Sequence, residues 1–253
     1  MRRTPGLLIQ SLVFAGLAAS PCVFGQGDSL PQSSPSLTMA SLPAEERGDI
    51  LMARGRYLEA VEAYREASSS AVVLNKMGIA YQHLSAVDLA KKDYEKALLI
   101  RPNYPEAINN LGAAYFAKRD YKKAIRLYRK AMKLMPDSAV VAANLGTAYF
   151  ARRDYRQGLE AYELAFRLDP NVFRMDNGTV IPAPSDRADR ARQDFCIAEL
   201  FAQSGNQQQA IEYLRKALNE GFKDVNKIKE EAVFAKLRQT SEFAQLMAEE
   251  KLH

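Results

Sequence analysis

The sequence predicts an all-α fold: a solenoid of about five helix-turn-helix repeats, closed by C-terminal capping helices. Two observations carry this prediction. The stretch NLGAAYFAKRDY at 110–121 returns 34 residues later as NLGTAYFARRDY at 144–155, with ten of the twelve positions identical. From Ala44 onward, apolar residues also recur at helical spacing. Because a single helix pair cannot bury its apolar face alone, such units must stack on one another.

Six positions keep the 34-residue period through three consecutive units. We expect the small residues among them to let the two helices of a unit approach closely, and the tyrosines to fill the gap to the next unit. A proline closes each second helix, because its ring cannot continue the helix. The predicted packing positions are Gly78, Gly112 and Gly146; Tyr81, Tyr115 and Tyr149; Ala90, Ala124 and Gly158; Tyr94, Tyr128 and Tyr162; Ala97, Ala131 and Ala165; and Pro102, Pro136 and Pro170.

The best copy of the repeat predicts helices over roughly 105–118 and 121–134, joined by the polar turn KRDY. An insertion at 171–190 precedes the last repeat, and Asn177–Gly178 inside it is a hairpin-turn signal that fits either a loop or a short β-hairpin. Residues 220–253 carry short amphipathic segments, which we interpret as helices that cap the last repeat. The repeats are expected near 41–70, 71–104, 105–138, 139–172 and 191–219, within a domain at 44–219.

The first 25 residues have the pattern of a signal peptide: the basic start MRR, an apolar run, and the small-residue pattern VFG before Gln26. We therefore expect export, with cleavage near Gly25 and a periplasmic or secreted mature protein. Residues 26–43 are rich in Ser and Pro and predict a disordered tether. Cys22 follows the apolar run, so lipid attachment there is an alternative, although Pro21 departs from the residues that usually precede a lipidated cysteine.

The formal net charge of +5 on 253 residues is mild and requires no nucleic-acid partner. Basic residues nevertheless cluster at 118–133 and again at 152–156. We interpret these cations as a solvated outer face of the second helices, with an anionic partner site as the alternative.

The pattern L-G-x-x-Y, then A-x-x-x-Y-x-x-A, then Pro, at a period of 34 residues, resembles the tetratricopeptide repeat (TPR). The resemblance covers about 41–219 and is to exported bacterial proteins of this family. It implies a right-handed superhelical solenoid that recognises proteins. The usual tryptophan of the first helix is absent from this chain, and Leu74, Ile108, Ala142 and Asp194 stand in its place.

Stacked repeats present their first helices as a concave groove, where a partner segment would bind. In many TPR proteins an asparagine at the positions of Asn110 and Asn144 holds the backbone of an extended peptide, because an amide can donate and accept at once. In the fifth unit the lining should include Arg192, Phe195 and Glu199. The predicted partner-binding residues are Asn75, Lys76, His83, Asn109, Asn110, Asn144 and Thr147.

Two histidines and two cysteines leave little material for a metal or nucleophilic site, and no phosphate-binding loop or catalytic motif is present in the sequence. We therefore expect no enzyme activity, no metal and no cofactor, and we interpret Cys196 as a buried thiol. The predicted function is a scaffold or adaptor in the cell envelope that binds another protein or a peptide segment. The alternative is a structural component of an envelope assembly, anchored to the membrane by a lipid on Cys22.

Overall fold

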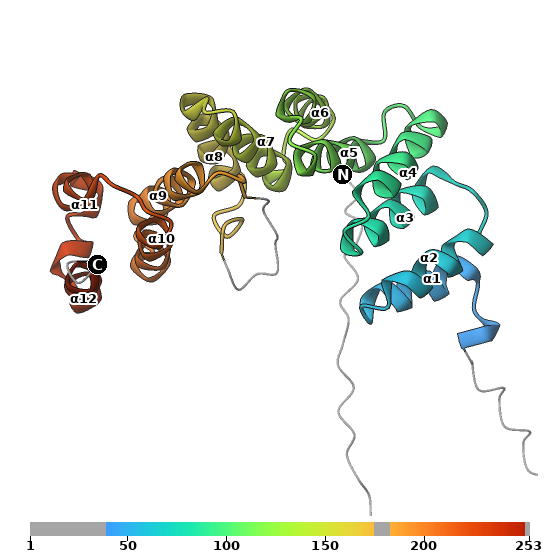
Figure 1. Cartoon of the computed structure of the whole chain (residues 1–253), viewed down its shortest axis with the longest axis horizontal. Coiled ribbons are helices and arrows are strands. Elements are labelled where there is room, and N and C mark those ends of the chain that lie inside the picture. The colour runs from blue at the N-terminus through green and yellow to red at the C-terminus, as the bar shows by residue number, and fades with distance from the viewer. Residues whose placement is uncertain (1–38, 175–182, 251–253) are drawn as a thin grey trace, which may run out of the picture. The chain divides into compact units, whose positions relative to one another are not determined.

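The computed structural model describes residues 39–174 and 183–250, all of which belong to the compact unit Thr38–His253 (Figure 1). The described residues form helices and connecting turns and contain no strand. Within these residues, no helix combines the length and the apolar character that crossing a membrane requires.

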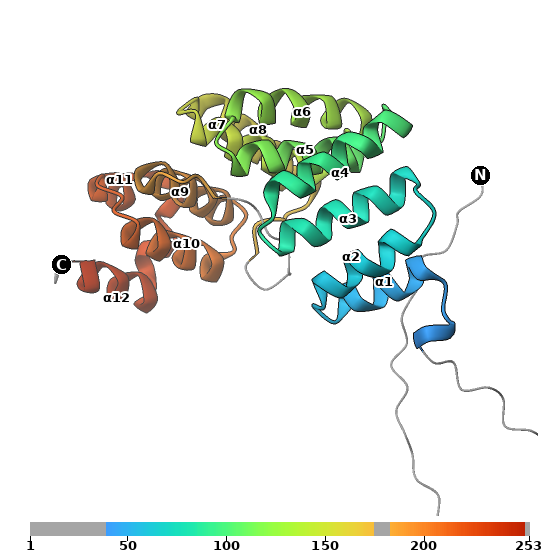
Figure 2. The same cartoon turned by 45° about the vertical axis from the view of Figure 1, so that its right-hand side comes forward.

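The helices follow one another as five pairs, and each helix contacts the helices before and after it (Figures 1 and 2). The predicted all-α repeat fold is therefore confirmed. The first helices of the pairs are α1 (Ala44–Ala53), α3 (Ala71–His83), α5 (Pro105–Ala117), α7 (Ala139–Ala151) and α9 (Arg187–Gln203). The second helices are α2 (Tyr57–Glu66), α4 (Val87–Ile100), α6 (Tyr121–Leu134), α8 (Tyr155–Leu168) and α10 (Gln207–Asn219).

The turn between the two helices of a pair has the same geometry in all five repeats. In the third repeat, the Asp120 N–H donates to the Tyr115 carbonyl oxygen at 2.9 Å, and Arg119 between them has a φ of 60°. This bond caps the C-terminal end of the first helix. It requires a residue in the left-handed region, where glycine is favoured. The residues at this position are Gly55, Ser85, Arg119, Arg153 and Gly205.

Each of the first four repeats packs a tyrosine of its second helix onto a glycine of its first helix. A Cβ added to Gly112 would lie 2.7 Å from Cε1 of Tyr128, and one added to Gly146 would lie 2.3 Å from Cδ1 of Tyr162. These glycines therefore make room mainly for a ring, and the predicted close approach of the partner-helix backbone is seen at Gly146, where an added Cβ would lie 3.0 Å from the Gly158 carbonyl oxygen. Tyr64, Tyr94, Tyr128 and Tyr162 are buried within their own repeats instead of filling the gap to the next one.

The tyrosines of the first helices make the contact between repeats. The Tyr81 hydroxyl accepts a hydrogen bond from Arg65 of the preceding second helix at 2.6 Å. The Tyr149 ring lies under the guanidinium of Arg129, which is 5.5 Å from the ring centroid. Of the predicted packing positions, these two tyrosines are buried and Tyr115 is half-buried. The alanines of the second helices (Ala90, Ala97, Ala124, Ala131 and Ala165) are fully buried.

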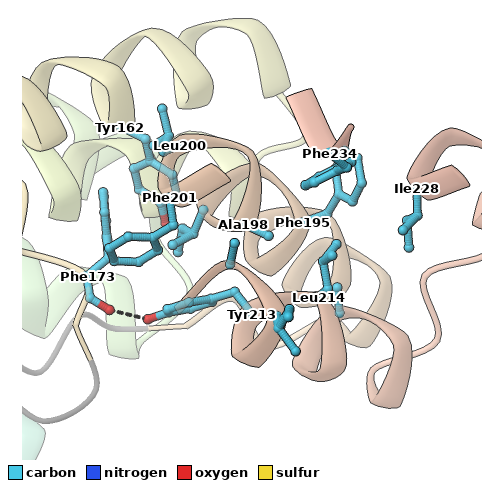
Figure 3. Close-up of a cluster of buried hydrophobic side chains, with 14 of the residues drawn as sticks. Tyr162, Phe173, Phe195, Ala198, Leu200, Phe201, Tyr213, Leu214, Ile228 and Phe234 are labelled. Atoms are coloured by element: carbon cyan, nitrogen blue, oxygen red, sulfur yellow. Dashed lines mark hydrogen bonds between the residues drawn. The ribbon is translucent and has the colours of Figure 1, made fainter. Parts of the chain in front are cut away.

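The largest buried cluster joins the fourth and fifth repeats to the C-terminal segment (Figure 3). Val172 and Phe173 follow α8 and are buried in this cluster, and the Phe173 carbonyl oxygen accepts a hydrogen bond from the Tyr213 hydroxyl at 2.5 Å. The start of the predicted insertion therefore belongs to the core. Asn177–Gly178, at the centre of the predicted hairpin, lies outside the described residues.

The predicted capping helices are present. Ile228, Phe234 and Leu237 are buried, as are Phe243 and Leu246. Because this apolar set covers the end of α9 and α10, the last repeat does not expose its core. The capping elements are α11 (Val225–Glu230), η2 (Ala232–Phe234), η3 (Leu237–Gln239) and α12 (Ser241–Glu250).

Two boundaries differ from the sequence prediction. A short 3-10 helix, η1 (Met39–Ser41), lies in the last part of the predicted tether. Helix α9 begins at Arg187, inside the predicted insertion, because the Asp186 carboxylate accepts hydrogen bonds from the N–H groups of Ala188 and Asp189. That N-cap adds a turn before the first periodic residue of the repeat.

The tyrosine hydroxyls in the repeat cores differ in a way that stability measurements should detect. The Tyr162 hydroxyl lies 2.7 Å from Oγ1 of Thr147, whereas the buried Tyr128 hydroxyl meets no hydrogen-bonding group of the described residues. We expect Tyr162→Phe to lower the free energy of unfolding by about 1 kcal/mol and Tyr128→Phe to leave it unchanged or raise it. Urea denaturation of the two variants checks this, and an equal loss from both would contradict it.

Candidate functional site

Four asparagines on three successive first helices form a chain of side-chain hydrogen bonds, which we call the asparagine relay. Asn144 Nδ2 donates to Asn109 Oδ1 at 3.1 Å, Asn109 Nδ2 donates to Asn110 Oδ1 at 3.3 Å, and Asn110 Nδ2 donates to Asn75 Oδ1 at 3.0 Å. Asn75 and Asn144 are each 5% exposed, while Asn109 and Asn110 are half-buried. The predicted groove asparagines therefore lie together, and their amides link α3, α5 and α7 to one another.

The relay connects residues that are 35 apart and not 34 apart. Asn110 of the third repeat bonds to Asn75, one position before its own equivalent in the second repeat. Ala143 occupies the next such position in α7, so no amide there continues the relay toward α9. These bonds cross-link the second, third and fourth repeats, while Asn144 Oδ1 is buried without a hydrogen-bond partner among the described residues.

Two further predicted groove residues have partners inside the domain. Lys76 Nζ lies 2.7 Å from Glu45 Oε1 and 2.7 Å from Asp49 Oδ2, which neutralise its charge between α3 and α1. Thr147 is fully buried, and its hydroxyl donates to the Ala143 carbonyl oxygen at 3.1 Å besides contacting the Tyr162 hydroxyl. The structure thus places Thr147 in the core of its repeat and not on the groove surface, because position 147 faces the second helix.

His83 is exposed at the last position of α3 and lies about 12 Å along the helix from Asn75. Its ring stacks on Tyr57 of α2, with the centroids 4.4 Å apart and an angle of 7° between the planes. His83 therefore belongs to the turn end of the repeats and lies apart from the relay.

The first-helix side of the fifth repeat contains a cleft of about 750 Å³, the C-terminal cleft. Its walls come from the start of α8, from α9, from the turn after α10 and from α11, so the fifth repeat and the cap build it together. The predicted fifth-unit residues Arg192, Phe195 and Glu199 all line it. The other lining residues are Tyr155, Arg156, Leu159, Ala188, Ala191, Cys196, Gly221, Phe222, Lys223, Asp224 and Lys227.

Aromatic rings and cations alternate in the C-terminal cleft. Phe195 and Phe222 are stacked, with ring centroids 4.3 Å apart and planes at 6°. Lys227 Nζ lies 4.6 Å from the centroid of the Phe195 ring, and the Arg192 guanidinium lies 4.3 Å from that of Tyr155. Such surfaces hold apolar side chains against the rings while the cations remain available to a carboxylate.

The carboxyl group of Glu199 lines the cleft and has a raised pKa. Burial, followed by hydrogen bonding to Glu231, raises the pKa of Glu199 to about 8, while the charge of Lys227 acts in the opposite direction. Lys227 Nζ lies 3.9 Å from Glu199 and 3.2 Å from Glu231. Glu199 is therefore protonated at neutral pH, which leaves the cleft with an excess of positive charge from Arg192 and Lys223.

The cysteine of the cleft is not an activated nucleophile. Cys196 is a half-buried free cysteine, and burial raises the pKa of its thiol to about 12, so the thiol stays protonated and unreactive. Among the described residues, no cluster of three or more His, Cys, Asp or Glu side chains could hold a metal ion. The cleft is suited to binding.

The sequence did not predict that the C-terminal segment contributes to a site. Phe222 and Lys223 come from the segment that the sequence predicts to cap the last repeat, and Tyr155 and Leu159 come from a second helix. The available signal was the GFKD stretch at 221–224, in which an aromatic residue stands next to a lysine directly after the last repeat helix.

Comparisons with known proteins identify the repeat. A family model described as tetratricopeptide repeat matches residues 69–137 and 104–171, and a second model with the same description matches 197–220. A comparison of the sequence with curated proteins gave no match.

Solved structures of MamA are similar in fold. The structure of MamA 41-end from Desulfovibrio magneticus RS-1 shares 21% identity at a TM-score of 0.50, covering 72% of this chain and 94% of that one. Two crystal structures of MamA each share 22% identity. One has a TM-score of 0.48 over 71% of this chain and 96% of that one. The other has a TM-score of 0.49 over 74% of this chain and 93% of that one.

The asparagine relay should contribute to the stability of the domain. We expect Asn110→Ala to lower the free energy of unfolding by about 1–2 kcal/mol, because it leaves the buried Asn75 amide without its donor. The exposed Asn103 is a matched control, and Asn103→Ala should change the value by less than about 0.5 kcal/mol. Denaturation curves that move equally for both variants would show that the relay does not couple the repeats.

The raised pKa of Glu199 predicts how stability depends on pH. The folded state holds the Glu199 proton up to about pH 8, whereas the unfolded chain releases it near pH 4.5. The resulting stability is therefore complete at low pH and is lost as the pH rises through 8. Thermal melts between pH 6 and pH 9 should fall more steeply for the wild type than for Glu199→Gln. The exposed Glu230→Gln should follow the wild type, and a Glu199→Gln profile that does so too would refute the assignment.

Proposed function

Because the chain belongs to the tetratricopeptide repeat family, we propose that it is an exported scaffold that holds a partner protein on the face of its first helices, anchored at the C-terminal cleft. Repeats of this family generally bind proteins and are generally non-catalytic, which supports a scaffold. Export is inferred from the signal-peptide pattern of residues 1–25, which lie outside the described residues.

The observation that carries the proposal is the difference between the two halves of the first-helix face. In the second to fourth repeats, the relay asparagines bond to one another, Thr147 bonds within its own repeat, and Lys76 pairs with two acids of the first repeat. In the fifth repeat, a cleft of about 750 Å³ is lined by stacked rings and by cations. Arg192 contacts Tyr155 and has no carboxylate within salt-bridge distance among the described residues. Binding therefore begins most readily at the cleft.

The chemistry of the cleft indicates the kind of segment it would take. The half-buried side chains of Phe222 and Leu159 offer an apolar slot next to the buried Phe195 ring, while Arg192 and Lys223 offer positive charge at its edge. An apolar or aromatic side chain with an acidic group beside it satisfies both. The half-buried Asn109 and Asn110 of the relay can then contact the rest of an extended segment along the first helices.

Charge reversal at the cleft tests the proposal. We expect the double variant Arg192→Glu, Lys223→Glu to lose at least tenfold in affinity for a partner protein retained by the wild type from an envelope extract, because two favourable charge contacts become repulsive. Both side chains are exposed, so the fold should be kept, and circular dichroism verifies this.

The matched control reverses two exposed cations far along the chain from the cleft, as Arg54→Glu, Lys92→Glu. This variant has the same net charge as the cleft variant and should retain the partner as the wild type does. Equal retention by the cleft variant, or equal loss by the control, would refute an anchoring role for the cleft.

A further inference from the structure

The second helix of the third repeat is unlike the other second helices in its charge. Helix α6 carries six cations and no acid, whereas α4 and α8 each carry acids and bases in equal number. All six cations of α6 are exposed: Lys122, Lys123, Arg126, Arg129, Lys130 and Lys133. The mild charge of the whole chain is therefore concentrated here, on the helix that packs outside α5 (Figure 2).

The turn before α6 and the equivalent turn of the next repeat add further cations to those of this helix. Lys118, Arg119 and Lys122 meet Arg152 of the next repeat around a shallow hollow of about 440 Å³. The carboxylate of Asp120 also lines the hollow, but it already pairs with Lys123 Nζ at 3.0 Å and caps α6. The hollow therefore presents four cations to solvent with its single acid already engaged.

Several of these cations are not matched by acids. Lys118 pairs with Asp88, and Arg153 is 3.6 Å from Asp189. In contrast, no carboxylate of the described residues lies within salt-bridge distance of the following cations, which we call the basic face: Arg119, Lys122, Arg126, Lys133 and Arg152.

One residue of the basic face, Arg119, has a backbone conformation that favours glycine. Arg119 has a φ of 60°, and the first and fifth repeats place Gly55 and Gly205 at the same turn position. A residue with a Cβ is disfavoured there relative to glycine. The packing of the repeat thus gives no reason for an arginine, and its charge at the rim of the hollow does.

From this arrangement we propose that the basic face docks the protein on a bilayer that contains anionic phospholipids. The cations are spread over an exposed helix and two turns and not gathered in a slot, which fits a dense and extended negative surface better than a peptide. Binding of single-stranded nucleic acid would need exposed rings for stacking. Tyr121 is the aromatic residue of the hollow, and it packs on Phe116 while its hydroxyl bonds to Ser185 at 3.1 Å.

The strength expected of such a contact is moderate. Each Lys or Arg at an anionic membrane surface adds a modest attraction, and the attraction decays within a Debye length. Five cations on one face therefore give reversible, salt-sensitive binding. This inference concerns a different surface from the C-terminal cleft and does not rest on which partner the cleft holds.

Vesicle sedimentation of the full-length chain tests the proposal. Vesicles of phosphatidylcholine with phosphatidylglycerol should bind the wild type at least tenfold more tightly than vesicles of phosphatidylcholine alone, and 0.5 M NaCl should remove the difference. The variant Arg119→Gln, Lys122→Gln, Arg126→Gln, Lys133→Gln should lose at least tenfold in affinity for the anionic vesicles. Any contribution from residues 1–25 is common to all variants.

Two controls make the outcome decisive. The variant Arg54→Gln, Lys92→Gln, Lys229→Gln, Lys236→Gln removes four exposed cations from elsewhere and should bind as the wild type does. An equal loss from this variant, or no preference of the wild type for anionic vesicles, overturns the proposal. Binding of poly-glutamate or an oligonucleotide that depends on the basic face, without vesicle binding, assigns the face to another partner and also overturns it. The cleft variant Arg192→Glu, Lys223→Glu should still bind vesicles, which separates this test from that of the scaffold function.

Discussion

In each of the first four repeats, the ring of a second-helix tyrosine packs against a glycine of the first helix, and the rest of the structure depends on this contact. An added Cβ at Gly48, Gly78, Gly112 or Gly146 would lie between 2.3 and 2.7 Å from a ring carbon, so only glycine fits. The ring fixes the separation and rotation of the two helices within a pair. That rotation in turn decides which side of the first helix meets the neighbouring repeat and which side meets solvent.

The rotation of the first helices explains where binding can occur. It turns Thr147 into its repeat core and brings Asn110 against Asn75 of the preceding first helix, so asparagines in the middle of the first-helix face bond to one another. At the fifth repeat, the capping segment stacks Phe222 on Phe195 and leaves a cleft with unpaired cations at its edge. The packed cores of the repeats and the C-terminal cleft are thus separate parts of the domain. The basic face is a third part, and the packing of the repeats does not require it.

The sequence predicted the paired helices well because the 34-residue period reflects how the side chains of each helix pair pack. The helices expected at 105–118 and 121–134 are Pro105–Ala117 and Tyr121–Leu134. The period could not show that Asn110 bonds 35 residues back, because aligned positions suggest equivalence between repeats and not contact between them. Nor could it show the C-terminal cleft, whose Tyr155 comes from the fourth repeat and whose Phe222 follows the last repeat, because only the tertiary fold brings them together.

Photo-crosslinking in the producing cells tests the account most directly. A photoreactive amino acid placed at Phe222 in the cleft should form an adduct with one partner protein, and the adduct should disappear when Arg192 and Lys223 are reversed in charge. The same amino acid placed at the exposed Asn103, outside the cleft, should give no adduct with that protein. A partner adduct of equal yield from Asn103, or one at Phe222 that survives the charge reversal, would contradict the claim that the C-terminal cleft anchors the partner.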